Sequence, residues 1–205
     1  MRQAGALGLA GALAIPGVAH AHAFASGGDA YGNFVDGTMV VLASPDLLLP
    51  VLALAVMLGL WHRDGILKAW PYAFLGSVAG IAAAPLAGPW VAGATLGIGA
   101  VLAVLAALVP LARISPAIPV LAALAALVTL ATALEGHAYA EIPHATRLGL
   151  LFGFHFMLAA VAGLVRYTRD QIDHPATTIG WRVVASWLAA ILVLYVAFSF
   201  SAPAT

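Results

Sequence analysis

Residues 90–112 read WVAGATLGIGAVLAVLAALVPLA, and no residue in this stretch carries a charge. A helix needs about 20 consecutive apolar residues to cross the hydrocarbon core of a bilayer. The stretch is long enough to do so and is bounded by tryptophan at one end and proline near the other. It therefore predicts a membrane-spanning helix, and the rest of the chain has to be compatible with a membrane.

Five further stretches follow the same pattern, which predicts a bundle of six transmembrane helices and an all-α fold. Hydrophobic residues make up 63% of the chain and charged residues only 8%, against about a quarter in soluble domains. The mean hydropathy is +1.04. The length of 205 residues leaves no room for a separate soluble domain. The six predicted spans are 39–61, 69–87, 90–112, 116–135, 146–167 and 181–201.

The first 21 residues have the layout of a secretory signal peptide. Arg2 precedes an apolar run of small residues, and the segment ends in a small-x-small cleavage pattern. Cleavage after Ala21 would make His22 the first residue of a mature domain, 22–205. The alternative is an uncleaved first anchor, although the run is short for a span and Pro16 interrupts it.

The cations predict how the spans are oriented. By the positive-inside rule, connectors rich in Lys and Arg face the cytoplasm. One side of the predicted bundle receives Arg63, Lys68, Arg113, Arg166, Arg169 and Arg182, and the other side receives only Arg147. The mature N-terminus then faces outward, as the signal peptide also predicts, and we expect a multi-pass protein of the bacterial inner membrane with a periplasmic N-terminus. The predicted outer side carries His22, Asp29, Asp36, Asp46, Glu135, His137, Glu141 and His144.

Composition and motifs narrow the class of function. The formal net charge is zero, so no basic surface predicts nucleic acid as a partner. Cysteine is absent, which excludes disulfides and thiolate ligands. The sequence has no nucleotide-binding loop, Ser–His–Asp arrangement or zincin helix, so it gives no support for an enzyme. The partners we expect are the lipid bilayer and, from the histidines considered below, a metal ion.

Small residues and prolines predict two details of the spans. Spacing of small residues by four lets helices approach closely in lipid, and it relates Gly93, Gly97 and Val101, and also Gly149 and Gly153. Pro50 lies inside the first predicted span, so we expect that span to begin irregularly and to become a regular helix only after Pro50.

The segment LEGHAYAEIPHATR, residues 134–147, concentrates ionisable groups between two apolar runs. His137 and Glu141 are four residues apart, so one helical turn would place them on one face. Imidazole with carboxylate suits divalent Ni, Co, Zn or Cu. Pro143 is expected to end that turn, with His144 just past the break and able to fold back. The alternative is a solvated loop that binds nothing.

Three other residues are candidates for binding or conducting a metal ion. His155 lies well inside the fifth span, where a histidine is costly unless it pairs or faces a polar cavity; the alternative is a bond to a neighbouring span. Asp46 is either a ligand or a helix N-cap, and Ser44 with Pro45 at the first helical position is the competing cap. His22, as a free N-terminus, could bind a cation through its amine and ring, or remain a flexible end.

These residues occur in an order that resembles a known family. The chain contains AHAHAF at residues 19–24, GNFVDG at 32–37, GHAYAEIP at 136–143 and LGLLFGFHFMLAAVAGLV at 148–165. It is similar to the HupE/UreJ family of small six-span membrane proteins, which are associated with hydrogenase and urease gene clusters and regarded as nickel or cobalt permeases. The similarity is closest in residues 136–165. The family typically shows a His–Gly–x–Glu–x–Pro motif followed by a Gly–Phe span that carries a histidine, and this chain offers His137, Glu141, Pro143 and the Gly153–His155 run in comparable order.

The resemblance implies a permease or metal-binding membrane protein with Asp46, His137, Glu141 and His144 at an outer mouth and His155 as a deeper station. The metal would be cargo or a bound ion and not a permanent cofactor. Two family features are missing, because residues 40–50 contain no histidine beside Asp46 and residues 89–97 contain no glutamate. This difference supports an alternative function as a non-transporting scaffold or assembly subunit for a metalloenzyme. A haem-binding subunit with His155 as axial ligand is a third hypothesis, although no second intramembrane histidine is evident.

Overall fold

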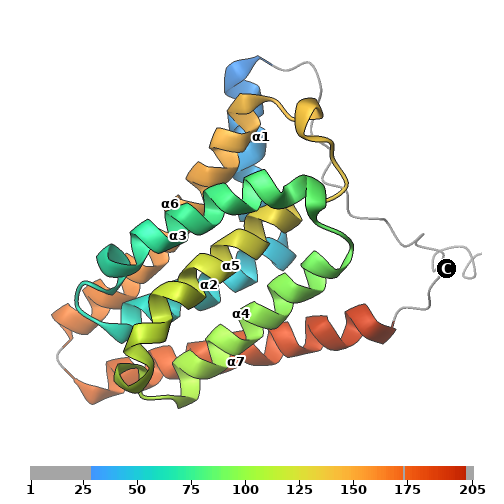
Figure 1. The fold of residues 1–205 in the computed structure, drawn as a ribbon. Coiled ribbons are helices and arrows are strands. Elements are labelled where there is room, and N and C mark those ends of the chain that lie inside the picture. Colours follow the sequence, from blue (N-terminus) through green and yellow to red (C-terminus); the bar gives the residue numbers. More distant parts are fainter. Residues whose placement is uncertain (1–28, 173, 202–205) are drawn as a thin grey trace, which may run out of the picture.

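Long apolar helices joined by short connectors form the described part of the chain, residues 29–172 and 174–201 of this computed structural model (Figure 1). Short 3₁₀ turns lie in three connectors, and no strand occurs in this part of the chain. The helices are α1 (Ala30–Ala43), α2 (Pro45–Trp61), α3 (Gly65–Ala83), α4 (Trp90–Leu108), α5 (Ile118–Ala133), α6 (His144–Gln171) and α7 (Pro175–Ser201), with turns η1 (Ala84–Leu86), η2 (Leu111–Ala117) and η3 (Tyr139–Glu141).

Five helical segments are long and apolar enough to cross a membrane, and the pair α1–α2 makes a sixth if it is counted as one broken span. The axes of α1 and α2 differ by 72°. Helices satisfy their own backbone hydrogen bonds, which is why such segments suit a solvent without hydrogen-bonding groups. The all-α fold predicted from the sequence is therefore confirmed for the described residues, and the apolar helices support the predicted multi-pass membrane protein. The predicted signal peptide and His22 lie outside the described residues.

The first predicted span departs from expectation. Asp29 begins α1 by accepting a hydrogen bond from the Gly32 amide at 2.7 Å, so regular helix begins well before Pro50. The break falls instead at Ser44, whose backbone is extended. Pro50 lies inside α2, buried beside Gly99, where an added Cβ would lie 2.9 Å from Pro50 Cβ. The expectation that Pro50 marks the start of regular helix is wrong, because packing against a glycine accommodates the ring.

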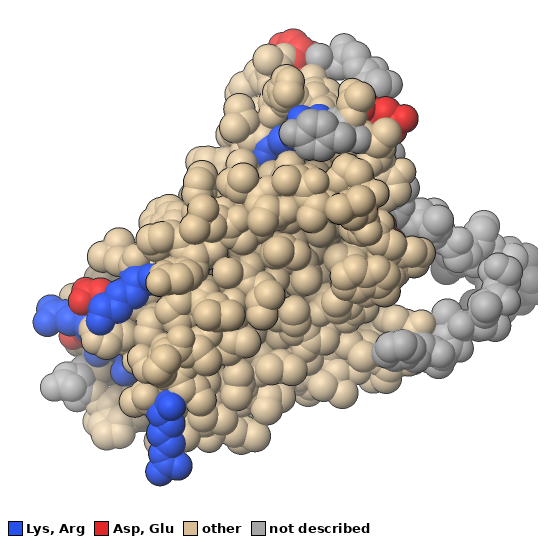
Figure 2. Space-filling view, in the orientation of Figure 1, with Lys and Arg blue, Asp and Glu red and all other residues tan. Residues whose placement is uncertain are grey.

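On the face that Figure 2 shows, charged side chains gather at the two ends of the molecule, with an uncharged belt between them. We call one end the cation-rich end; its connectors and helix ends carry Arg63, Lys68, Arg113, Arg166, Arg169 and Arg182. The opposite end, which we call the acidic end, carries Asp29, Glu135 and Glu141, together with Arg147, around the starts of α1 and α6. Charges are costly in hydrocarbon and stable in water, so this distribution fits helices that run from one membrane surface to the other.

Glycines bring α6 into backbone contact with α1. A Cβ added at Gly149 would overlap the Phe34 carbonyl oxygen, and one at Gly37 would overlap that of Thr146. At Gly153 it would lie 2.8 Å from the Thr38 carbonyl oxygen. The predicted packing role of Gly149 and Gly153 is confirmed. The same kind of contact joins α3 to α5, where a Cβ at Gly76 or Gly80 would meet backbone atoms of α5.

The other predicted glycine row does not pack. An added Cβ at Gly93 or Gly97 would meet no atom within 4 Å, and Val101 is 54% exposed. The face of α4 that these residues share is therefore open to the surroundings. The expectation of a helix–helix contact there is wrong, because spacing alone does not distinguish a lipid-facing row of small residues from a buried one.

The connector at the cation-rich end is shorter than the sequence indicates. Residues 166–182 read as a solvated loop, but α6 continues to Gln171 and α7 begins at Pro175. His174 accepts a hydrogen bond from the Ala176 amide at 3.1 Å, which satisfies one of the free donors at the start of α7. His174 therefore has the structural role that its position before Pro175 predicts.

Substituting Gly149 with alanine should destabilise the protein by about 1–3 kcal/mol, because the new methyl group has to displace backbone and not a side chain. Gly97→Ala is the matched control, since it adds the same group into open space on another spanning helix. Thermal unfolding of the purified protein in one detergent measures both. Equal unfolding temperatures for the two variants would contradict the contact between α1 and α6.

Candidate functional site

His137 and Glu141 do not share a helical turn. The turn η3 begins at Tyr139, after His137, and ends at Glu141. The His137 Nδ1 atom lies 3.1 Å from the Glu135 carbonyl oxygen, and a Glu141 carboxylate oxygen accepts the Ala138 amide at 3.1 Å. The two side chains thus bond to the backbone of their own connector. The predicted common face is wrong, because the connector forms a tight 3₁₀ turn and not a turn of α-helix.

Glu135 lies in the same connector and is partly buried. Burial raises the pKa of its carboxyl group above the ordinary value for glutamate, because a carboxylate loses hydration there. Its negative charge is therefore less stable than that of a fully hydrated glutamate. Among the carboxylates of this connector, the exposed Glu141 is the better attractor for a cation.

Pro143 ends the connector, as predicted, and α6 begins at His144. The Nη1 atom of Arg147 lies 3.4 Å from His144 Nδ1, one helical turn apart. Arg147 is only 7% exposed and lines an apolar cavity of about 320 Å³ between α3 and α6. A cation beside His144 raises the cost of a second positive charge there, so His144 is a weak candidate for a metal ligand.

Asp46 occupies the first turn of α2, with Ser44 in the N-cap position and Pro45 at the first helical position. The backbone amide of Leu48 bonds to the Ser44 carbonyl at 2.8 Å, whereas the Ser44 side chain makes no capping bond. Within residues 29–172 and 174–201, no three His, Asp or Glu side chains come together in a group that could hold a metal ion. The structure thus does not assemble the predicted mouth of Asp46, His137, Glu141 and His144 into one site.

His155 differs from the other predicted residues because it lies deep within a spanning helix and has one buried ring nitrogen without a hydrogen-bond partner in the described part of the chain. At 1.5 Å per residue it lies about 16 Å along α6 from His144, deep within the spanning part of the helix. Its Nε2 atom lies 3.1 Å from the Ser77 hydroxyl on α3. Its Nδ1 atom is buried and has no hydrogen-bond partner in the described part of the chain.

The Ser77 hydroxyl determines which nitrogen of His155 carries the proton. The Ser77 hydroxyl lies 2.9 Å from the Phe74 carbonyl oxygen, and when it donates its single proton there it accepts from His155. The proton of the neutral imidazole is then on Nε2, and Nδ1 carries a free lone pair. A neutral imidazole with a free lone pair is the form that binds a metal ion or accepts a proton.

Aromatic side chains of α3 and α6 contact the His155 ring. Trp70 stacks on it with ring centroids 5.9 Å apart and planes 13° apart, and Phe74 lies at 5.7 Å. Phe154 is perpendicular to it at 5.1 Å. These contacts fix the orientation of the ring, so the direction of the Nδ1 lone pair is fixed as well.

Sequence reasoning identified His155 but missed its neighbours. Ser77, Trp70 and Phe74 belong to α3, about 80 residues earlier in the chain. Their spacing of three to four residues places them on one helical face, which was a usable signal, but such a face is more often ordinary packing. Comparisons with protein-family models, curated proteins and solved structures found no match to this chain.

Replacing Ser77 with alanine should destabilise the protein by about 1–3 kcal/mol, because the buried His155 Nε2–H loses its acceptor. Ser186→Ala is the control, since that hydroxyl is exposed and bonds only within α7. Chemical unfolding in detergent measures the change.

Adding His155→Leu to Ser77→Ala should recover part of the loss, since neither polar partner then remains. Additive losses in the double variant would show that the two side chains do not interact.

Proposed function

We propose that this protein is a metal-handling membrane protein of HupE/UreJ type that moves a divalent transition-metal ion across the bacterial inner membrane. The observation that carries the proposal is the buried, unpartnered Nδ1 of His155. A polar atom left without a partner in an apolar interior costs free energy, so its retention favours a role with a ligand or ion. The family resemblance of residues 136–165 points to the same class of cargo.

The chemistry of the side chains fits a nickel or cobalt ion, and copper or zinc also suit imidazole and carboxylate. Exposed Glu141 would attract the ion at the acidic end, His137 would replace part of its water, and His155 would receive it at depth. Asp46, His144 and His22 complete the predicted set of ligands. Each described candidate offers one or two donor atoms and not a complete coordination shell. Binding at each site would therefore be weak, and conduction requires weak sites in succession.

The predicted orientation is consistent with uptake. Under the positive-inside rule the cation-rich end faces the cytoplasm, and the acidic end and the mature N-terminus face the periplasm. An outward acidic surface raises the local concentration of cations. His155, on α6, would then bind an ion that has already entered the bundle.

The second candidate function is a non-transporting scaffold for maturation of a metalloenzyme. Two observations favour it: the described ligands do not gather into a metal group, and His137 and Glu141 bond to their own backbone. Such a protein would present its acidic end to a partner and would need no ion pathway. The metal-accumulation test below distinguishes the two functions.

Cells that express His155→Ala should accumulate nickel or cobalt at least tenfold more slowly than cells with the wild-type protein, because the ion loses the one imidazole that lies deep within the described spans. His174→Ala is the matched control, since that histidine caps α7 at the opposite end. Elemental analysis of washed cells, normalised to protein in the membrane, gives the rates. Unchanged accumulation with His155→Ala would reject transport through this residue and leave the scaffold function.

Uptake should also fall as the external pH drops below about 6, because imidazole binds metal only in its neutral form. Uptake falls and does not rise at low pH because a proton and the metal ion compete for the same lone pair. Initial rates of nickel uptake between pH 5 and pH 8, at constant membrane potential, test this. A rate that is flat or rises toward low pH would contradict imidazole ligation.

A further inference from the structure

The cation-rich end holds more positive charge than its own carboxylates balance. Six of the eight Lys and Arg residues of the chain lie there, with Asp64 and Asp170 as carboxylates in the described part (Figure 2). Asp173 lies outside the described residues. Such an excess at the membrane surface predicts attraction of an anionic group.

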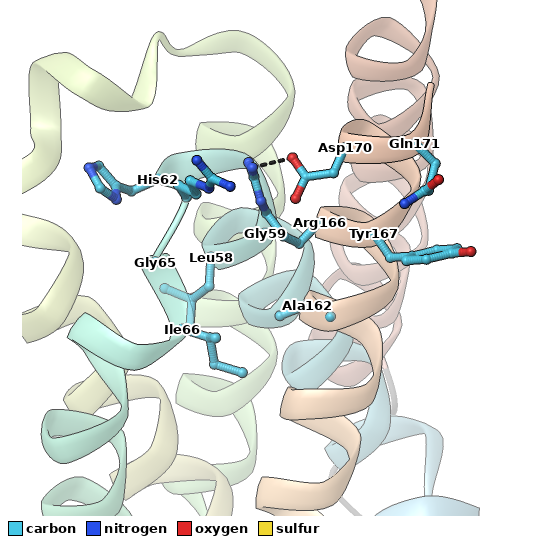
Figure 3. A pocket seen from close by; sticks show the side chains of 12 residues that line it. Leu58, Gly59, His62, Gly65, Ile66, Ala162, Arg166, Tyr167, Asp170 and Gln171 are labelled. Carbon is cyan, nitrogen blue, oxygen red and sulfur yellow. Dashed lines mark hydrogen bonds and ion pairs between the residues drawn. The ribbon is translucent and has the colours of Figure 1, made fainter. Parts of the chain in front are cut away.

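A cleft of about 280 Å³ opens at this end between α6 and the junction of α2 with α3 (Figure 3). Its inner wall is apolar and includes Leu58, Ile66 and Ala162, while charged and polar side chains form its rim. The rim consists of His62, Arg63, Arg166, Tyr167, Asp170 and Gln171. The combination of an apolar wall and a basic rim is suited to an amphiphile with an anionic head group.

The contacts show which cations are available to a ligand. Arg169 donates hydrogen bonds to the carbonyl oxygens of Gly59 and Leu60 at 3.0 and 3.2 Å, so it closes the end of α2. Arg166 pairs with Asp170. Arg63 is exposed and forms no ion pair with any carboxylate that the structure describes. Arg63 is therefore the rim cation most available to a ligand, whereas the charge of Arg166 is partly balanced by one carboxylate.

Gly163 leaves space for a hydrocarbon chain beside this rim. It lines the cleft, is exposed, and an added Cβ there would meet no atom within 4 Å. The neighbouring Tyr167 is 64% exposed, in the interfacial position that tyrosine favours. The groove thus continues from the charged rim onto the lipid-facing side of α6.

We propose that this cleft binds an anionic glycerophospholipid, with its phosphate at Arg63 and Arg166 and an acyl chain along the groove at Gly163. A lipid fits better than free phosphate because most of the cleft wall is apolar and the groove opens toward the bilayer. The site is at the opposite end from the acidic end and includes none of the proposed metal-binding residues. The lipid-binding proposal therefore does not depend on the proposed function, and an experiment can reject either one without the other.

Lipid binding to the purified full-length protein in a neutral detergent tests the proposal, with native mass spectrometry as the readout. Phosphatidylglycerol should bind, phosphatidylcholine should bind at least fivefold more weakly, and inorganic phosphate at millimolar concentration should not displace the lipid. Arg63→Gln should weaken phosphatidylglycerol binding about fivefold, as expected for one cation near a membrane surface. Asp170→Asn should strengthen phosphatidylglycerol binding, because the substitution leaves Arg166 without its paired carboxylate. A variant that failed to fold would not bind the lipid more tightly, so this result distinguishes an effect on binding from a loss of folding.

Gly163→Leu should block the groove and reduce phosphatidylglycerol binding at least fivefold. Gly97→Leu is its matched control, because it also places a large side chain in open space on a spanning helix. Equal binding of the two lipids, or equal effects of Gly163→Leu and Gly97→Leu, would overturn the proposal. Displacement by inorganic phosphate would replace it with a free-phosphate site.

Discussion

The cost of leaving a polar group without a hydrogen bond in hydrocarbon governs this structure. Helices satisfy the backbone within each span, which is why the described residues form helices and short turns. Side-chain hydroxyls follow the same rule: the buried Thr95 and Thr132 hydroxyls lie 2.7 Å apart between α4 and α5. Against this background, the unpartnered Nδ1 of His155 is an exception, and it is the observation on which the proposed function rests.

Hydropathy predicted most of the fold because the spans differ so strongly from their connectors. It could not predict the 72° bend at Ser44, since apolar composition continues through the break and a bend depends on one residue's backbone. It also could not tell Gly149, which touches α1, from Gly97, which touches nothing. In a membrane both the core and the surroundings are apolar, so sequence pattern does not reveal which face is buried.

The candidate site was predicted only in part. The depth of His155 could be read from its position within an apolar run, but its partner Ser77 is on another helix and no local spacing connects them. The shared helical face expected for His137 and Glu141 is wrong for a different reason. In the connector at residues 134–143, His137 lies before the 3₁₀ turn and Glu141 ends it, and both side chains bond to nearby backbone, so four-residue spacing was misleading there.

The central claim is that His155 presents a fixed, unprotonated Nδ1 to an ion inside the bundle. Nitrogen-15 NMR of histidine-labelled protein in lipid bilayers measures directly which ring nitrogen is protonated. The His155 signals are assigned as those that disappear in the His155→Leu variant. We expect a neutral ring with its proton on Nε2, and a change in the Nδ1 signal when zinc ions are added. A proton on Nδ1, or a signal that zinc leaves unchanged, would contradict the account.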